Sequence, residues 1–176
     1  MNMNKVLIVI DMQNDFLTGA LANPAGVEAL PHVRDQIVQA MNRDDIIIYT
    51  RDTHFDDYLN THEGKYLPVP HCIINTKGWE IEDSIAHPEY FRAYVINKET
   101  FGTLEWERYR DLIEAADEIL ICGLVSSICV VSNALILRAM FPEKDISFLS
   151  EASAGLAPED HAAACTIMKC SHINIK

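Results

Sequence analysis

The sequence predicts an α/β fold: a single-domain, three-layer α-β-α sandwich around a six-stranded, mostly parallel sheet. Short apolar runs of strand length alternate along the chain with longer segments that carry helical patterns. The runs are apolar at almost every position, as strands are when helices cover both faces of a sheet. The chain has 176 residues, 49% of them hydrophobic, so we expect one globular domain over residues 1–176.

The first part of the chain supplies two strands joined by a helix. Residues 5–10 and 46–50 are runs of strand length, apolar at nearly every position. Residues 27–41, between them, have the spacing of an amphipathic helix. The apolar face of this helix consists of Leu30, Val33, Ile37 and Met41.

The middle of the chain begins with a long polar segment. Residues 52–72 are dense in histidine and acidic residues and are expected to be irregular. A loop of this length inside a small domain is usually functional. Beyond it, we expect a turn and short helix at 78–85, a strand at 93–97 and an acidic helix at 104–116.

The last part of the chain is expected to add three strands and two helices. The apolar run 119–122 ends at Gly123, and Ser126 and Ser127 are good caps for a helix at 127–140. The remaining elements are expected at 145–150 (strand), at 158–170 (helix, with a proline near its start) and at 172–175 (short strand).

Charge and cysteine content narrow the class of protein. The net charge is −12 and the pI about 4.9, which argues against nucleic acid or an anionic membrane as partner. The N-terminal apolar run is too short for a signal peptide or membrane span. The odd number of cysteines, without regular spacing, predicts reduced thiols in a cytoplasmic protein. They are Cys72, Cys122, Cys129, Cys165 and Cys170.

Four potentially reactive residues directly follow expected strands: Asp11, Asp52, Lys98 and Cys129. The carboxyl ends of parallel strands line one edge of a sheet. Cys129 is also expected in the first turn of its helix, where the dipole and a nearby Lys98 would lower the thiol pKa below its usual value near 8.5. Each residue has an ordinary alternative: a core cysteine, a turn aspartate or a solvated lysine. Their shared position favours catalysis.

The polar loop contains candidate metal ligands. Asp52, His54, Glu63 and His71 could converge on one divalent ion, because imidazole and carboxylate groups suit Zn, Mn or Fe. Their spacing follows no regular zinc-finger or HExxH pattern. The alternative is a solvated surface loop with incidental histidines, and the spacing alone leaves both open.

Three stretches together resemble a known family. D-M-Q-N-D-F at 11–16, N-K-E-T-F-G-T at 97–103 and C-G-L-V-S-S-I-C-V-V-S-N-A at 122–134 are similar to the isochorismatase-like cysteine hydrolases, in order along the whole chain. Within that family, R-D-T-H at 51–54 and E-G-K-Y-L-P-V-P-H-C at 63–72 resemble the metal loop of nicotinamidases, also called pyrazinamidases.

The resemblance implies roles for particular residues. It implies a triad with Cys129 as nucleophile, Asp11 as base and Lys98 as their partner. It implies substrate contacts at Phe16, Val125 and Cys129. A cis peptide at 124–125 is implied as well, turning the N–H groups of Val125 and Cys129 toward the substrate oxygen.

The resemblance also implies a metal site and an activity. The ligands would be Asp52, His54 and His71, with Glu63 where some members use a fourth side chain, and the ion Zn, or else Mn or Fe. The activity would be hydrolysis of a carbon–nitrogen bond in a linear amide: nicotinamide to nicotinate and ammonia, through a thioester. A cytoplasmic homo-oligomer acting on a small molecule, with no nucleic-acid or membrane partner, is expected.

Two other functions remain open at this stage. One is a cysteine hydrolase of the same fold acting on another small amide or ureido compound, and the other is a non-enzymatic binding module. The intact triad argues against the second, and the metal loop favours nicotinamidase over the first. Two positions depart from the family pattern: Ser126-Ser127 stands where many members have Thr-Asp, and Pro68 where an aromatic residue is common, with Tyr66 or Leu67 as substitutes.

Overall fold

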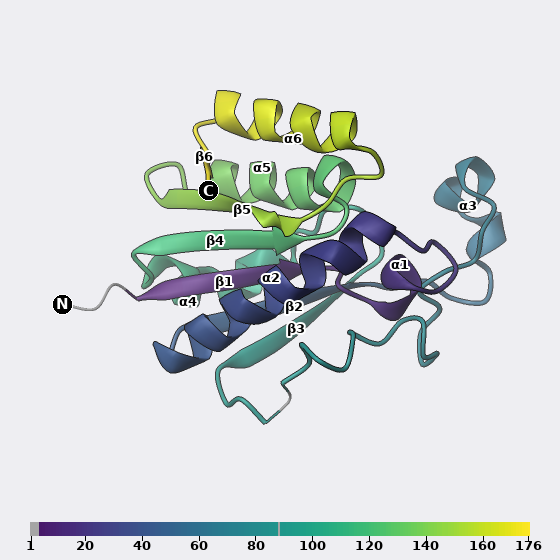
Figure 1. Ribbon diagram of the computed structural model, residues 1–176, viewed down its shortest axis with the longest axis horizontal. Coiled ribbons are helices and arrows are strands. Elements are labelled where there is room, and N and C mark those ends of the chain that lie inside the picture. Colours follow the sequence, from purple (N-terminus) through teal and green to yellow (C-terminus); the bar gives the residue numbers. More distant parts are fainter. Residues whose placement is uncertain (1–3, 88) are drawn as a thin grey trace.

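The computed structural model describes residues 4–87 and 89–176. Its centre is a six-stranded sheet with the order β3-β2-β1-β4-β5-β6, in which each pair of neighbours is parallel (Figure 1). The predicted α/β class is therefore confirmed. The strands are β1 (Lys5–Ile10), β2 (Ile46–Asp52), β3 (Ala93–Lys98), β4 (Glu118–Gly123), β5 (Asp145–Ser153) and β6 (Asn174–Ile175).

Alternate residues of the central strands pack into two separate apolar cores. In β1, Val6 and Ile8 lie in one core, whereas Leu7 and Val9 lie in the other. Neighbouring strands continue both layers, since Val6 pairs with Ile46 in the parallel register. Because each face of the sheet is covered, these strands are apolar throughout, which is the pattern that predicted parallel strands.

Helices cover both faces of the sheet and give the three layers (Figure 1). On the side of Leu7 and Val9 lie α1 (Asn14–Leu17) and α2 (Pro24–Asn42). The other side carries α4 (Arg110–Glu114), α5 (Val131–Met140) and α6 (Pro158–Cys170). Among the described residues, no helix combines the length and the apolar character needed to cross a bilayer.

The helices predicted at 104–116 and at 78–85 differ from the structure. The expected helix at 104–116 is divided into a 3₁₀ segment, η2 (Glu105–Tyr109), and the short α4. In η2, Trp106 is fully buried and its indole N–H donates to Asn133. Residues 78–85 form turns without a helix, because this segment is held against the chain after β1: Ile81 makes an antiparallel bridge to Gln13.

The long connection between β2 and β3 projects beyond the carboxyl ends of the strands (Figure 1). It contains a 3₁₀ turn, η1 (Tyr58–Asn60), and the short α3 (His62–Tyr66) within the segment predicted to be irregular. Thr61 caps α3 by accepting a hydrogen bond from Gly64 N–H. Tyr58 is buried, and its hydroxyl donates to the Leu67 carbonyl, which folds the connection back on itself.

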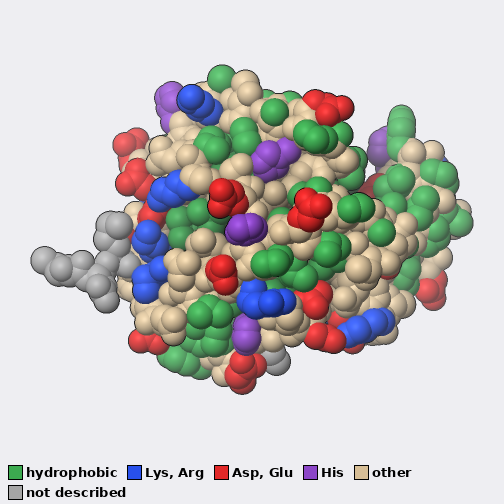
Figure 2. All heavy atoms as spheres, viewed as in Figure 1, with side chains coloured by type: hydrophobic (Ala, Val, Ile, Leu, Met, Phe, Trp, Pro, Cys, Tyr) green, Lys and Arg blue, Asp and Glu red, His purple; other side chains and the backbone are tan. Residues whose placement is uncertain are grey.

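The amino ends of the strands have a different surface. Acidic, basic and apolar side chains are spread over the face in Figure 2, and lysine and arginine side chains gather toward its left edge. Lys5, Arg43 and Lys176 line one hollow near this end of the sheet. The reactive residues predicted from the sequence all lie at the opposite, carboxyl end.

Candidate active site and metal cluster

Adjacent strands bring the acidic and basic candidates together. Asp11 follows the end of β1, while Asp52 and Lys98 are the last residues of β2 and β3 and are partners in register. Lys98 Nζ lies 2.6 Å from Asp11 Oδ2 and 3.3 Å from Asp52 Oδ1. All three side chains are buried. The lysine therefore sits between two carboxylates out of contact with bulk water.

A tight turn after β4 sets the start of the helix that carries the thiol. Gly123 has a φ of +115°, and a Cβ there would lie 2.1 Å from a backbone oxygen of β1, so only glycine fits. The peptide bond between Leu124 and Val125 is cis, as the resemblance implied. Ser126 N–H then donates to the Ala154 carbonyl at 2.8 Å, which ties the turn to the end of β5.

Cys129 lies in a π-helical turn, η3 (Ser126–Val130), where the sequence predicted the first turn of an α-helix. Its side chain is buried, and Sγ is 3.7 Å from Lys98 Nζ. Single π-helical turns are frequent at functional sites. The thiol thus joins a buried group that also contains one ammonium and two carboxylates, Asp11 and Asp52.

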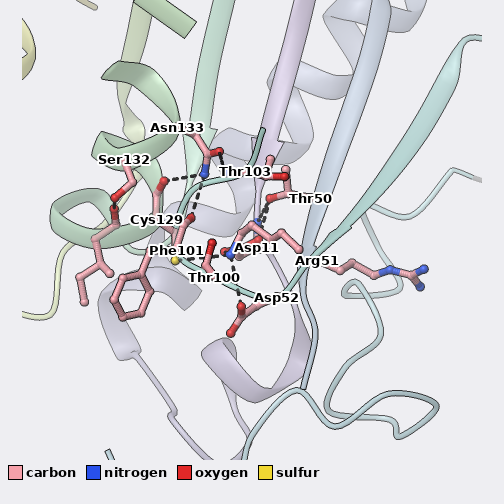
Figure 3. A network of polar contacts seen from close by, with 12 residues as sticks. Asp11, Thr50, Arg51, Asp52, Thr100, Phe101, Thr103, Cys129, Ser132 and Asn133 are labelled. Carbon is pink, nitrogen blue, oxygen red and sulfur yellow. Dashed lines mark hydrogen bonds and ion pairs between the residues drawn. The ribbon is translucent and has the colours of Figure 1, made fainter. Parts of the chain in front are cut away.

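Asp11 is oriented by Thr50, which the sequence analysis did not single out. Thr50 Oγ1 donates a hydrogen bond to Asp11 Oδ1 at 2.6 Å, and the Asp11 N–H donates one to Thr50 Oγ1 at 3.2 Å (Figure 3). Asp11 has a φ of +48°, in the left-handed region. One carboxylate oxygen is thereby fixed by the hydroxyl, and the other faces Lys98. In the sequence, nothing distinguishes Thr50 from any other strand threonine.

Burial controls the proton affinity of the thiol and of Asp11. It raises the pKa of the Cys129 thiol well above its usual range; Lys98 opposes this effect, and Asp11 and Asp52 add to it. The expected lowering of the thiol pKa is therefore wrong, because a helix start and one lysine do not outweigh burial beside two carboxylates. Burial also raises the pKa of Asp11, against the charge of Lys98, and so improves this carboxylate as a proton acceptor.

The other two charges of the group stay ionised. Burial disfavours the ammonium of Lys98, but Asp11, Cys129 and Asp52 around it raise its pKa above the usual range. Burial likewise disfavours the Asp52 carboxylate, yet Lys98 and the hydrogen bonds of two histidines hold its pKa below the usual range. Asp52 and Lys98 are thus a fixed ion pair, beside which Asp11 and Cys129 are the groups able to exchange a proton.

The four predicted metal ligands form a compact cluster next to this ion pair. His54 Nε2 lies 2.9 Å from Asp52 Oδ2, and His71 Nε2 lies 3.4 Å from the same oxygen. Glu63 Oε1 is 3.7 Å and 3.6 Å from these two nitrogens, and one ligand atom from each residue lies within 4.8 Å of the others. Zinc binds nitrogen and oxygen ligands at about 2.0–2.2 Å. Donors of this kind, this close together, fit a single ion.

His71 is held with the correct nitrogen facing the cluster. Its Nδ1 is 2.8 Å from the Val69 carbonyl, which can only accept, so Nδ1 carries a proton and Nε2 faces Asp52 and Glu63. The Phe16 ring packs against the His71 ring with centroids 5.5 Å apart. A backbone carbonyl behind a histidine is the arrangement that orients metal-binding imidazoles in proteins.

Known proteins match this chain in sequence and in fold over most of its length. The isochorismatase domain matches residues 5–174. The chain belongs to the isochorismatase family. Nicotinamidase from Schizosaccharomyces pombe is 24% identical, covering 99% of this chain and 94% of that protein, and nicotinamidase from Saccharomyces cerevisiae is 28% identical, covering 74% and 80%. The zinc complex of pyrazinamidase from Pyrococcus horikoshii superposes with a TM-score of 0.84 at 30% identity, covering 98% of each chain.

This isochorismatase-family chain also uses two residues of the D-M-Q-N-D-F stretch that had no assigned role. Gln13 is completely buried and clamps the backbone of Asp52: its Oε1 accepts from the N–H at 2.7 Å, and its Nε2 donates to the carbonyl at 2.9 Å. Asp15 Oδ2 accepts from Cys72 N–H at 2.7 Å, directly after His71. The one feature of the sequence that could have indicated these roles is the position of both residues in the stretch that carries the family resemblance.

The two departures from the family pattern have distinct surroundings. Ser126 Oγ lies 3.1 Å from His161 Nδ1, and His161 Nε2 lies 2.9 Å from Ser150 Oγ, so the hydroxyl is tied to α6 and β5. Pro68 is exposed. Tyr66 does not replace the missing ring over the site, since it is 81% exposed and packs against His62.

Proposed function

We propose that this chain is a metal-dependent cysteine amidohydrolase, a nicotinamidase that converts nicotinamide to nicotinate and ammonia. One observation carries the proposal. Asp52 belongs to both halves of the site, with Oδ1 at 3.3 Å from Lys98 and Oδ2 at 2.9 Å from His54. A thiol with an acid–base partner therefore stands beside a cluster that suits a divalent ion. The nicotinamidases and pyrazinamidases among the relatives support the choice of substrate.

The triad residues account for the bond changes. Asp11 takes the thiol proton as Cys129 Sγ attacks the amide carbonyl carbon. The tetrahedral adduct then expels ammonia, which leaves with the proton held by Asp11, and a thioester remains. Asp11 next takes a proton from water, whose oxygen attacks the thioester. The adduct expels the Cys129 thiolate and releases nicotinic acid, and Asp11 returns the proton to the sulfur. Lys98 keeps the Asp11 carboxylate in place and compensates the negative charge that passes between oxygen and sulfur.

The turn before Cys129 is proposed to stabilise the negative charge that develops on the substrate oxygen. The backbone N–H groups of Val125 and Cys129 are proposed as the donors to the substrate oxygen, and elsewhere such a donor is worth about 3–4 kcal/mol. Phe16 and Val125, both largely buried, are proposed to contact the substrate ring. The metal ligands are assigned to Asp52, His54, Glu63 and His71, for Zn or else Mn or Fe. A bound ion would supply a Lewis-acid position for a ring nitrogen.

The wider setting of the enzyme is part of the same proposal. Residues 1–176 are taken as one isochorismatase-like domain that works in the cytoplasm as a homo-oligomer. The substrate is a small amide rather than a nucleic acid or a membrane surface, in keeping with a net charge of −12. The second candidate is a cysteine hydrolase for another small amide or ureido compound. The exposed Pro68 and the outward Tyr66 favour it, because neither supplies a second ring for a pyridine.

Two amides of the same shape separate the candidates. Benzamide lacks the ring nitrogen of nicotinamide, so it cannot use a metal to orient its carboxamide over Cys129. We expect nicotinamide to be hydrolysed and benzamide to be at least about 100-fold slower, on the scale by which misplaced substrates lose rate. Chelation should abolish the nicotinamide reaction, and Zn, Mn or Fe should restore it. Ammonia release is measured on enzyme of known metal content.

The same measurement can reject the nicotinamidase assignment. Equal rates for the two amides, or full activity on nicotinamide in metal-free enzyme, would contradict it. Ammonia release from a ureido compound in either of those cases would establish the second candidate. The Cys129→Ala variant is the control for ammonia that does not come from this site.

A further inference from the structure

Lys98 and Cys129 come from strands that are not neighbours in the sheet. Lys98 ends β3 and Cys129 follows β4, and β2 and β1 lie between these two strands. No ladder of backbone hydrogen bonds joins β3 to β4 directly. The 3.7 Å separation of Lys98 Nζ and Cys129 Sγ therefore depends on how the two segments after these strands are held together.

The side chain of Asn133 makes that connection (Figure 3). Its Nδ2 donates to the Cys129 carbonyl at 2.8 Å and to the Phe101 carbonyl at 3.0 Å. Its Oδ1 accepts from Thr103 N–H at 3.1 Å and from the indole N–H of Trp106 at 3.0 Å. Both donors and both acceptor positions of the amide are occupied, and the residue is fully buried.

The contacts around Asn133 show that the connection is close. Three of its four partners lie in residues 101–106, the segment that follows Lys98, and the fourth is the carbonyl of the nucleophile itself. A Cβ on Gly102 would lie 2.7 Å from Ile136 Cδ1, so the segment runs directly against α5. Trp106 is completely buried and fixes the far end of the segment.

We propose that Asn133 is a positioning residue that sets the placement of the Cys129 thiol relative to Lys98 and Asp11. It acts through the backbone at both ends: the carbonyl of the residue that carries the thiol, and the loop that leaves the lysine. This inference rests on the proposed role of Cys129 as nucleophile, but not on which amide is the substrate. A residue that only stabilised the fold could occupy the same place. The test therefore needs a measurement that a change in stability alone does not alter.

The experiment measures how fast Cys129 reacts with iodoacetamide, with peptide mapping to separate it from the other cysteines. In Asn133→Ala we expect the labelling rate to fall about 10-fold and kcat to fall about 10–100-fold, with KM within about threefold, because a small displacement of reacting groups has effects of this size. Ser147→Ala is the matched control. It also removes a hydrogen bond of a fully buried side chain, to Glu118 at 2.6 Å, but at the other end of the sheet.

The outcomes are separable. Ser147→Ala should lose thermal stability and keep the wild-type labelling rate and kcat. If Asn133→Ala labels Cys129 as fast as the wild type, or loses rate only in proportion to its unfolded fraction as the control does, the positioning role is wrong. Labelling alkylates the thiol and does not depend on hydrolysis of an amide, so it decides the question even if nicotinamide proves not to be a substrate.

A second variant covers the case in which Asn133→Ala does not fold. Trp106→Phe keeps most of the buried ring and removes one of the two donors to Asn133 Oδ1. We expect Cys129 labelling about two- to fivefold slower in this variant, since only one of the three hydrogen bonds between Asn133 and the segment is lost. Labelling of folded Trp106→Phe at the wild-type rate would overturn the proposal.

Discussion

Charged side chains gather at both ends of the sheet, and the two groups differ in their ratio of carboxylates to cations. At the amino end, Glu118 is a single carboxylate with two cations: Oε2 lies 2.7 Å from Lys5 Nζ, and Oε1 contacts Lys176. Ser147 also donates to this carboxylate at 2.6 Å. At the carboxyl end, Asp11 and Asp52 share Lys98 with the Cys129 thiol.

The number of cations around each carboxylate sets the pKa of that carboxylate. Burial disfavours the Glu118 carboxylate, but Lys176, Lys5 and Ser147 outweigh burial and lower its pKa to about 2. Burial raises the pKa of Asp11, and one shared lysine does not reverse it. A carboxylate with surplus donors is locked as an anion and stabilises the fold, whereas one with too few donors keeps the capacity to accept a proton.

The largest expected effect is on turnover, and it should be confined to the carboxyl end. Cys129→Ala should abolish hydrolysis because it removes the nucleophile. Asp11→Asn and Lys98→Ala should each lower kcat by about two or more orders of magnitude, the scale of general acid–base catalysis. Glu118→Gln, at the amino end, should keep kcat within about twofold, since no reacting group contacts it.

Two results would contradict this expected difference in kcat between the two ends of the sheet. Near-normal kcat for Asp11→Asn with any good substrate would show that the base is elsewhere. A large loss of kcat in folded Glu118→Gln would show that the two ends of the sheet are coupled. The fraction of folded protein in each variant, measured by circular dichroism, separates lost chemistry from lost structure.

A smaller effect is expected from Gln13, which connects the segment after β1 to Asp52, one of the proposed metal ligands. Gln13→Glu keeps the acceptor for Asp52 N–H but places an oxygen against two carbonyls, those of Asp52 and Trp79, to which Nε2 now donates. Asp52 should shift, and zinc should bind about 10–100-fold more weakly, as when the supporting contacts of other metal ligands are removed. Competition with a chromogenic chelator measures the affinity.

Asn14→Asp provides the control for this change. Asn14 Nδ2 also donates to two carbonyls, of Lys77 and Glu80, but these bonds are exposed to solvent. The same amide-to-acid substitution, one residue away, should leave zinc affinity within about twofold because it touches no ligand. Equal zinc affinities in the two variants would mean that Gln13 does not position Asp52.

The sequence predicted the sheet and its reactive edge because both depend on local patterns. Continuous apolar runs mark strands covered on both faces, and a polar residue directly after such a run must fall at the carboxyl end. This rule placed Asp11, Asp52 and Lys98 at the same edge of the sheet without knowledge of the strand order. Cys129 lies at the same edge of the sheet because of a π-helical turn, which no local sequence pattern indicates.

Features that depend on distant contacts were not predictable. The first half of the helix expected at 104–116 is a 3₁₀ segment, in which Trp106 donates a hydrogen bond to Asn133, a residue far along the chain. Thr50 and Gln13 act through contacts across neighbouring segments, so their roles are visible only once the sheet is assembled. The direction of the Cys129 pKa was wrong for the same reason: depth of burial belongs to the folded chain.

The smallest expected effect concerns stability at acid pH, and it belongs to the amino end. The pKa of Glu118 falls from 4.5 to about 2 on folding, so its stabilisation is complete above about pH 4.5. As pH falls from 4.5 toward 2, the unfolded chain takes up this proton first, and the stabilisation is lost. The shift corresponds to roughly 3 kcal/mol, and solvent at the half-exposed Lys176 reduces this to about 1–2 kcal/mol.

Glu118→Gln should therefore lower the free energy of unfolding by about 1–2 kcal/mol at neutral pH and by progressively less between pH 4.5 and 2. Urea unfolding at several pH values measures this. The matched control is Glu105→Gln, which removes an exposed carboxylate paired with Arg108 at 2.9 Å and should change stability by less than about 0.5 kcal/mol. A constant difference between Glu118→Gln and the wild type across this pH range would mean that the carboxylate is not stabilised by its two lysines.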